Sequence, residues 1–182
     1  MITTTWLGLV GPGVANSGVN SITWTEHADI RPTMMLLLGL KDDYSYDGHV
    51  IIQALAQNAI PQAMMGIGLG MPPGSPSSTT FASLAQMYDQ INAPTGQFAM
   101  STLTISTHAL ESNTPGDSTY TTLESQLSSM TLQRNVIAAQ MISLLQGAEF
   151  NNQRIDPNQA QSLISQGQSL LNQANELATL LA

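Results

Sequence analysis

Three histidines, His27, His49 and His108, are the side chains best suited to binding a metal or moving a proton. A metal site needs two or three ligand groups that converge. No converging set of ligand groups is recognised around the three histidines, and His108 lies in a Ser- and Thr-rich stretch without a histidine or carboxylate four residues away. We therefore interpret all three as surface or locally hydrogen-bonded side chains. Serine is too common here for any one to mark a Ser-His-Asp triad, so we assign no catalytic, cofactor-binding or metal-ligating residue.

A second group that could bind a cation lies in residues 41–47, which hold three aspartates. Asp43, Ser45 and Asp47 alternate as the oxygen ligands of a calcium loop do, but the central glycine and the closing glutamate of such a loop are missing. A cation site and a solvated turn both remain open as interpretations. We favour the turn.

Composition excludes several classes of function. The chain has 182 residues, 42% of them hydrophobic, which is room for one domain or for a partial domain with a helical extension. Only 9% are charged and the net charge is −8, which argues against a nucleic-acid partner because phosphates are bound by cations. Cysteine is absent, which excludes disulfides and thiolate metal sites.

Targeting and membrane signals are not found in the sequence. Residues 1–14 carry no basic region of the kind that opens a signal peptide. The apolar region 50–71 is interrupted by Gln, Asn and Pro, so we reject it as a membrane span. The glycine-rich residues 66–70 lack the third glycine and the preceding strand of a dinucleotide-binding loop.

The first 40 residues predict short extended pieces followed by one helix. Residues 6–10 are apolar on both faces, as in a short buried strand. Residues 11–13, Gly-Pro-Gly, predict a turn, and residues 21–24 predict a second extended piece. A helix should follow, capped by Asp29 and ended by Gly39. Its expected core-facing stripe is Ile30, Met34, Leu37 and Leu38.

The rest of the chain predicts a linker and four helices. Residues 71–79, rich in Pro, Gly and Ser, read as the linker. Helical periodicity then covers residues 80–91, 95–111, 118–145 and 157–181, with Gly147 as a terminator and Asp156 as a cap before Pro157. Two long amphipathic helices joined by a short connection predict an antiparallel hairpin, 118–146 with 157–181.

Three segments resemble the end of the catalytic domain in alkaline-phosphatase-superfamily hydrolases, which are metal-dependent phosphatases, phosphodiesterases and sulfatases. They are residues 4–14 with the Gly-Pro-Gly turn, residues 24–40 with Asp-Ile-Arg-Pro-Thr, and residues 47–51 with Asp-Gly. The resemblance implies an α-rich α/β fragment. In that fragment a remnant of the catalytic domain (residues 1–70), with short strands and a helix, precedes the linker (71–79) and a helical extension (80–182).

The same resemblance carries the functional expectations. It implies a non-catalytic C-terminal fragment of a secreted, phosphoester- or sulfoester-cleaving hydrolase whose nucleophile and metal ligands lie outside this chain. The parent would need a divalent metal, namely zinc, calcium, manganese or magnesium, whereas this chain would hold no cofactor. Its partner would be the missing N-terminal part of the catalytic domain. Two alternatives stay open: a self-contained α-rich domain, and a helical interaction or oligomerisation module that self-associates through its C-terminal helices and has no enzymatic role.

Overall fold

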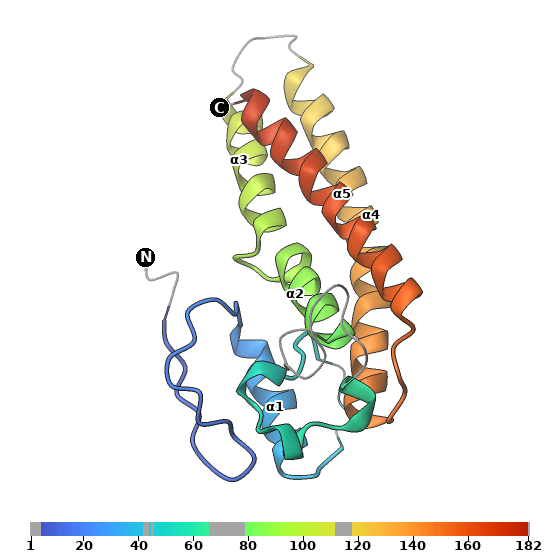
Figure 1. The fold of residues 1–182 in the computed structure, drawn as a ribbon. Coiled ribbons are helices and arrows are strands. Elements are labelled where there is room, and N and C mark those ends of the chain that lie inside the picture. The colour runs from blue at the N-terminus through green and yellow to red at the C-terminus, as the bar shows by residue number, and fades with distance from the viewer. Residues whose placement is uncertain (1–4, 42–43, 45, 66–78, 112–117, 182) are drawn as a thin grey trace.

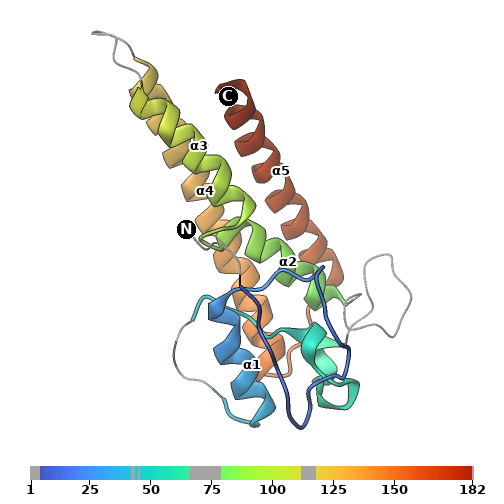
Figure 2. The same ribbon diagram turned by 90° about the vertical axis from the view of Figure 1, so that its left-hand side faces the viewer.

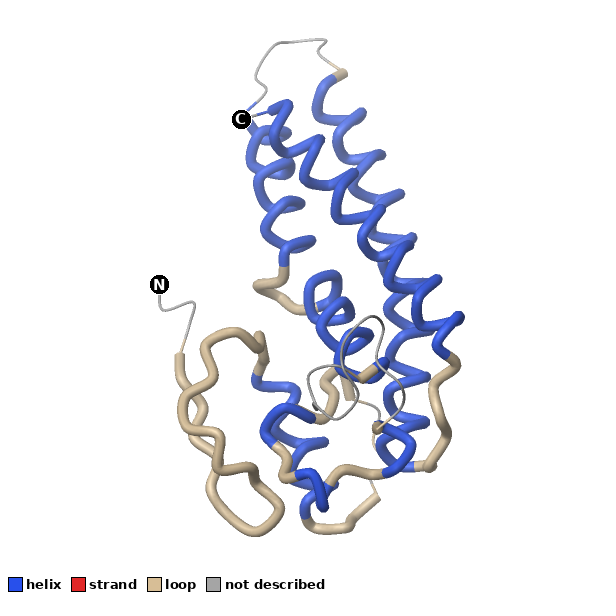
Figure 3. The backbone as a smooth tube through the Cα atoms, viewed as in Figure 1, coloured by secondary structure: helices blue, strands red, loops and turns tan. Residues whose placement is uncertain are grey.

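The fold is all-helical in the computed structural model, which describes residues 5–41, 44, 46–65, 79–111 and 118–181 (Figure 1). Its α-helices are α1 (Ile30–Leu37), α2 (Thr80–Asn92), α3 (Gln97–Glu111), α4 (Thr119–Phe150) and α5 (Pro157–Leu181). Short 3-10 helices lie at η1 (His27–Asp29), η2 (Ile52–Ala54), η3 (Gln57–Ala59) and η4 (Gln62–Met64). The predicted α/β fragment is therefore wrong, because no strand occurs among the described residues (Figure 3).

The predicted strands fail because nothing pairs with them. The backbone of residues 6–10 makes no backbone hydrogen bond to another described residue, and Trp6 and Val10 are 87% and 99% exposed. A strand depends on such ladder bonds. The Gly-Pro-Gly turn is confirmed, since the Val14 N–H donates to the Gly11 carbonyl at 3.2 Å. Val14 then forms one isolated antiparallel bridge, to Leu55.

Residues 21–24 also differ from the prediction. The side-chain oxygen of Asn20 accepts hydrogen bonds from the N–H groups of Ile22 and Thr23, both at 3.0 Å. This local turn takes the donors that a sheet would have used. The segment is bent, and Ile22 is 92% exposed.

Helices α2 to α5 form an up-down-up bundle in which α2 and α3 together make the first arm (Figure 1; Figure 2). Both α2 and α3 pack against α4 and against α5. The first arm is interrupted at residues 93–96, where Pro94 cannot donate a helical hydrogen bond. Helix α3 then begins at Gln97, and the carbonyl of the preceding Gly96 accepts from the Met100 N–H at 3.1 Å.

The two long helices run antiparallel, and their boundaries show local chemistry (Figure 1). Helix α4 continues past Gly147, so the predicted terminator is wrong. The Gly147 carbonyl accepts from the N–H groups of Asn151 and Gln153, and the chain turns at Asn152, which has φ of 53°. The cap at Asp156 is confirmed: its side-chain oxygen accepts from the N–H groups of residues 158 and 159 at 2.7 and 3.2 Å.

One hydrophobic core joins the bundle to the N-terminal half. Buried side chains from all four bundle helices meet those of the segment 50–64 in this core. Its largest members are Ile52, Leu55, Met64, Phe81, Leu84, Tyr88, Ile91, Ile105, Met141, Leu145, Leu163 and Leu170. The predicted linker 71–79 lies outside the described residues apart from Thr79, and the division into domains 1–70 and 80–182 stays a prediction.

Helix α1 ends as predicted but buries a different face. Gly39 takes φ of +66°, and the Leu40 N–H reaches back to the Met35 carbonyl at 2.9 Å, which is the Schellman ending. The buried residues of α1 are Pro32 and Thr33. Of the predicted stripe, Leu37 packs against the core and Ile30 is partly buried, whereas Met34 and Leu38 are 44% and 64% exposed, so only part of the stripe faces this chain's core.

No helix among the described residues is both long enough and apolar enough to span a membrane.

The bundle predicts a sharp contrast between two leucines of α5. Leu170 is 1% exposed and Leu180 is 83% exposed. Replacing Leu170 by Ala should lower the free energy of unfolding by about 2–5 kcal/mol, because the lost contacts leave a cavity. Leu180→Ala is the matched control and should change stability by less than about 0.5 kcal/mol. Urea denaturation followed by circular dichroism measures both; equal losses would contradict the packing.

A buried histidine–carboxylate cluster as candidate functional site

Residues 49–51 follow the turn predicted at residues 41–47, and their backbone is held by side chains instead of by a sheet. The N–H groups of residues 49, 50 and 51 donate in turn to Asp29 Oδ1 at 2.9 Å, Glu149 Oε1 at 2.7 Å and Thr33 Oγ1 at 2.9 Å. Asp29 and Thr33 lie at the start of α1, and Glu149 lies near the end of α4. The middle amide, that of Val50, ties this segment to the bundle, while the other two hold it against the start of α1.

Gly48 allows this approach. A Cβ at this position would lie 2.2 Å from the Ala28 carbonyl carbon and oxygen, and 2.7 Å from the Asp29 nitrogen. Any other residue would push the segment away from η1, and the bond from His49 N–H to Asp29 would lengthen. The other Asp29 oxygen, Oδ2, accepts from the Glu26 N–H at 2.9 Å. Asp29 thus holds two backbone turns together and does not cap α1 with its side chain.

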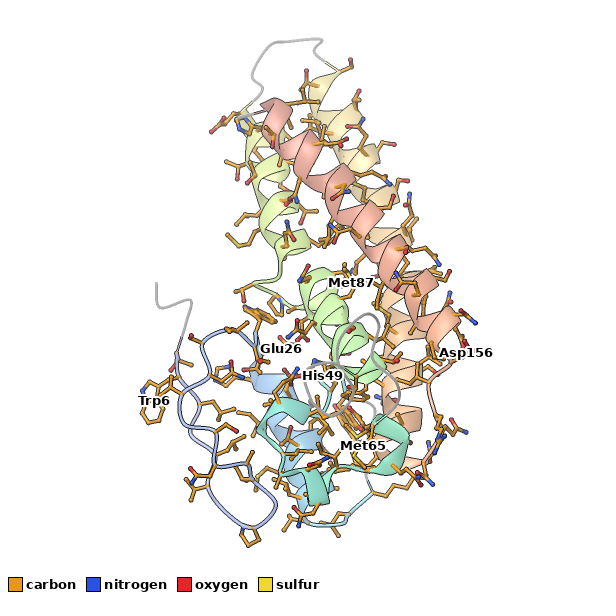
Figure 4. The ribbon with its side chains drawn as sticks, viewed as in Figure 1. Trp6, Glu26, His49, Met65, Met87 and Asp156 are labelled. Carbon is orange, nitrogen blue, oxygen red and sulfur yellow. The ribbon has the colours of Figure 1, made fainter. Side chains whose placement is uncertain are left out.

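The imidazole of His49 lies at the centre of the cluster (Figure 4). Its Nδ1 is 3.1 Å from the Val50 carbonyl oxygen, and its Nε2 is 3.0 Å from both carboxylate oxygens of Asp89 and 3.8 Å from Asp29 Oδ1. His49, Asp29 and Asp89 are 3%, 0% and 1% exposed. The rings of Phe81 and Tyr88 lie edge-on to the imidazole. One histidine and two carboxylates therefore meet where water has almost no access.

The charge state of His49 follows from these contacts. Burial on its own disfavours the charged imidazolium, but the hydrogen bond and charge of Asp89, the charge of Asp29 and the bond to Val50 outweigh it. Together they raise the pKa of His49 from 6.5 to about 9. At neutral pH the ring is then doubly protonated, donating from Nδ1 to the carbonyl and from Nε2 to Asp89.

Three carboxyl groups around this centre are harder to ionise than usual. Burial raises the pKa of Asp89 to about 6, although His49 pulls it down. Burial likewise raises the pKa of Glu149 to about 7, against the opposing bond from the Val50 N–H and the charge of His49. For Glu26, burial and the charges of Asp29 and Asp89 raise the pKa to about 7. The site therefore holds more carboxyl groups than its single imidazolium can neutralise.

The chemistry available here is the binding of a cation or a proton. Asp29, His49 and Asp89 can each offer one ligand atom, and these three atoms lie within 4.8 Å of one another. Two surface hollows, one along residues 5–25 and one between α4 and α5, are lined by none of these residues. Neither of these two hollows opens onto the cluster.

The structure corrects the interpretation of one histidine. His27 is exposed, and His108 is about one-third exposed beside Glu111 Oε2 at 3.5 Å, as expected of surface or locally bonded groups. His49 is buried among converging carboxylates, so the prediction that no such convergence exists is wrong for this residue. In the predicted turn, Asp47 is exposed, while Asp43 and Ser45 lie outside the described residues.

Sequence reasoning missed Asp89 and Glu149 entirely. A signal for them does exist. Asp89 is the sole charged residue of α2, and Glu149 lies in the apolar run at the end of α4. In a chain with so few charges, a carboxylate on a helix face that is otherwise apolar indicates a buried partner. The sequence does not indicate which residue that partner is. For Asp89 the partner is His49, 40 positions away, and only the fold brings the two together.

Comparison with known proteins adds no assignment. No protein-family model, no curated protein and no solved structure matches this chain.

The raised pKa of His49 predicts how stability depends on pH. Between pH 6.5 and 9 the folded chain holds a proton that the unfolded chain releases. The stabilisation is therefore complete below pH 6.5 and is lost as the pH rises through 9. Between pH 7 and 9 the free energy of unfolding should fall by about 2–3 kcal/mol in metal-free protein.

Proton NMR of the imidazoles and urea denaturation at several pH values test this directly. One histidine resonance, absent in His49→Gln, should titrate near pH 9. The variant His108→Gln is the control and should retain the pH dependence of stability. Titration of all three rings near 6.5, with flat stability, would contradict the ion pair.

Proposed function

We propose that this chain is a non-catalytic structural module that docks on and completes the α/β catalytic domain of a metal-dependent phosphoester or sulfoester hydrolase. The observation that carries the proposal is the apolar surface of residues 5–25. Trp6, Val10, Val19 and Ile22 are 87–99% exposed there. Monomeric proteins rarely leave large apolar groups clustered on one segment, and such clusters mark interaction surfaces.

The backbone of this segment supports a sheet-like partner. Residues 6–10 leave their N–H and C=O groups without a described backbone partner, next to exposed apolar side chains. A neighbouring strand would form hydrogen bonds with these backbone groups and bury the apolar side chains, which is the way in which peptides add to a sheet edge. Trp6 projects outward from this flank, away from the bundle (Figure 4).

The segments that resemble the hydrolase superfamily also support the proposal through their mutual contacts. Asp29 belongs to the Asp-Ile-Arg-Pro-Thr segment, and Gly48 and His49 belong to the Asp-Gly segment. The first binds the backbone of the second at 2.9 Å, and Gly48 is required for the approach. Residues that carry the resemblance thus have a common structural task, and catalysis is assigned to the partner domain.

The test uses this chain and the polypeptide encoded immediately upstream of it. The two should co-purify when co-expressed. Trp6→Ser with Val10→Ser should abolish the association, because both side chains would lie in the interface. Leu180→Ser, which alters an equally exposed side chain on the bundle, is the matched control and should associate normally.

Activity measurements complete this test. The chain alone, supplied with zinc, manganese, calcium or magnesium, should hydrolyse chromogenic phosphate and sulfate esters no faster than the background rate. The complex should hydrolyse at least one of these esters. Metal-dependent turnover by the chain alone, or association that survives the double substitution, would overturn the proposal.

A second candidate is self-association through the C-terminal helices. The hollow between α4 and α5 is flanked by Leu132 and Val136, which lie one helical turn apart and are 67% and 60% exposed. No charged residue lines it, so two copies of a chain of net charge −8 could meet there with little repulsion. Light scattering should then report a dimer that Leu132→Asp with Val136→Asp converts to a monomer. A wild-type monomer at high concentration would exclude this function.

A further inference from the structure

We infer that Asp29, His49 and Asp89 form a binding site for a divalent transition-metal ion that fastens the N-terminal half to the bundle. The inference concerns this chain's own residues and does not depend on the proposed function. It departs from the sequence-based expectation that this chain holds no metal.

The spacing of the ligand atoms is close to that of a tetrahedral metal site. In a tetrahedral site with bonds of about 2.0–2.1 Å, the ligand atoms lie about 3.4 Å from one another. His49 Nε2 is 3.0 Å from the Asp89 oxygens and 3.8 Å from Asp29 Oδ1. These distances fall on either side of the tetrahedral value, so small side-chain movements would complete the geometry.

The orientation of the imidazole is that of a metal ligand. A metal-ligating histidine donates its other ring N–H to a carbonyl or carboxylate, which fixes the tautomer and directs the free nitrogen at the ion. Nδ1 of His49 lies 3.1 Å from the Val50 carbonyl oxygen, and the Val50 backbone is itself held by Glu149. The nitrogen that faces both aspartates, Nε2, is therefore the one that would bind the ion in place of a proton.

Charge balance also favours a divalent ion. A dication with a neutral imidazole and the two carboxylates of Asp29 and Asp89 sums to zero, and buried charge is costly unless it is paired.

The donor set restricts the ion. One imidazole nitrogen and two carboxylates suit zinc or another first-row transition metal. Calcium prefers six to eight oxygen ligands and is a poor match. The group supplies three protein ligands, so a water molecule would fill the fourth position of a tetrahedral site. All three ligands are almost fully buried, which suits an ion that holds elements of the fold together.

The position of the site explains what a bound ion would do. Asp29 lies in η1, His49 in the segment before η2, and Asp89 in α2. Asp29 and His49 belong to the N-terminal half and Asp89 to the bundle, so one ion would add a cross-link to those that the core and hydrogen bonds such as Val50 to Glu149 already make. Metal loading should therefore raise the melting temperature of the whole chain.

The experiment uses the full chain, stripped with a chelator and reloaded with cobalt(II) or zinc(II). Gel-filtered protein should retain one metal per chain, and cobalt should give the intense visible absorption of a tetrahedral site. Calorimetry near pH 7.5, in buffers of different ionisation enthalpy, should report about one proton released per zinc bound, because the ion displaces the proton on His49.

Three variants make the assignment specific. Asp89→Asn and His49→Gln should lose the retained metal, the cobalt spectrum and the rise in melting temperature. His108→Gln, which removes a histidine that also neighbours a carboxylate, should keep all three. Circular dichroism of each chelated variant separates lost binding from lost folding. If Asp89→Asn unfolds, the proton release and cobalt spectrum of the wild-type chain still decide.

The proposal is overturned if chelated wild-type protein fails to retain cobalt or zinc above background. It is equally overturned if retention persists in folded His49→Gln and is lost in His108→Gln. In the first case the cluster is an ion pair with a proton at its centre; in the second the metal binds the bundle surface.

Discussion

The structure depends on three side chains that accept the backbone N–H groups of residues 49–51, a segment that has no sheet partner. A side-chain oxygen accepts each of the three N–H groups of residues 49–51: Asp29 and Thr33 supply two from the start of α1, and Glu149 supplies one from the end of α4. Buried amides left unpaired would each cost about 1–3 kcal/mol, so these acceptors cannot be replaced by apolar groups without penalty. Asp29, Thr33 and Glu149 thus determine where α1 and the end of α4 lie relative to each other.

Charged residues are few, and three carboxylates among them are buried. Only 9% of the residues are charged, yet Asp29, Asp89 and Glu149 are all buried. The bundle surface uses neutral pairs in place of ion pairs, for example Gln168 with Asn172 one helical turn away at 3.1 Å. Such pairs contribute only tenths of a kcal/mol. The helices therefore owe their stability to the core, and their relative placement at the base of the bundle to the buried acids.

Sequence patterns predicted the long helices well because helical periodicity is a local property. The bounds of α2, α3 and α5 fall within a few residues of the expected ones, and Asp156 caps α5 as its position before Pro157 indicates. The strands were mispredicted because an apolar run specifies a strand only when a neighbour pairs with it. The cluster was missed for a similar reason. His49, Asp89 and Glu149 are separated by 40 and 60 positions, and only the packing of α2 against α4 brings them together.

The mispredicted strand and the proposed docking surface have one physical origin. The apolar run of residues 6–10 is typical of a strand covered on both faces, yet Trp6 and Val10 within it are 87% and 99% exposed. Burying Trp6 or Val10 would yield about 1.5–3 kcal/mol each, whereas ordering each residue of the segment costs about 1–2 kcal/mol. Burial alone therefore barely offsets the ordering. A strand forms here only if a partner supplies ladder hydrogen bonds as well as apolar cover, so the edge of a sheet fits this flank better than a flat hydrophobic surface does.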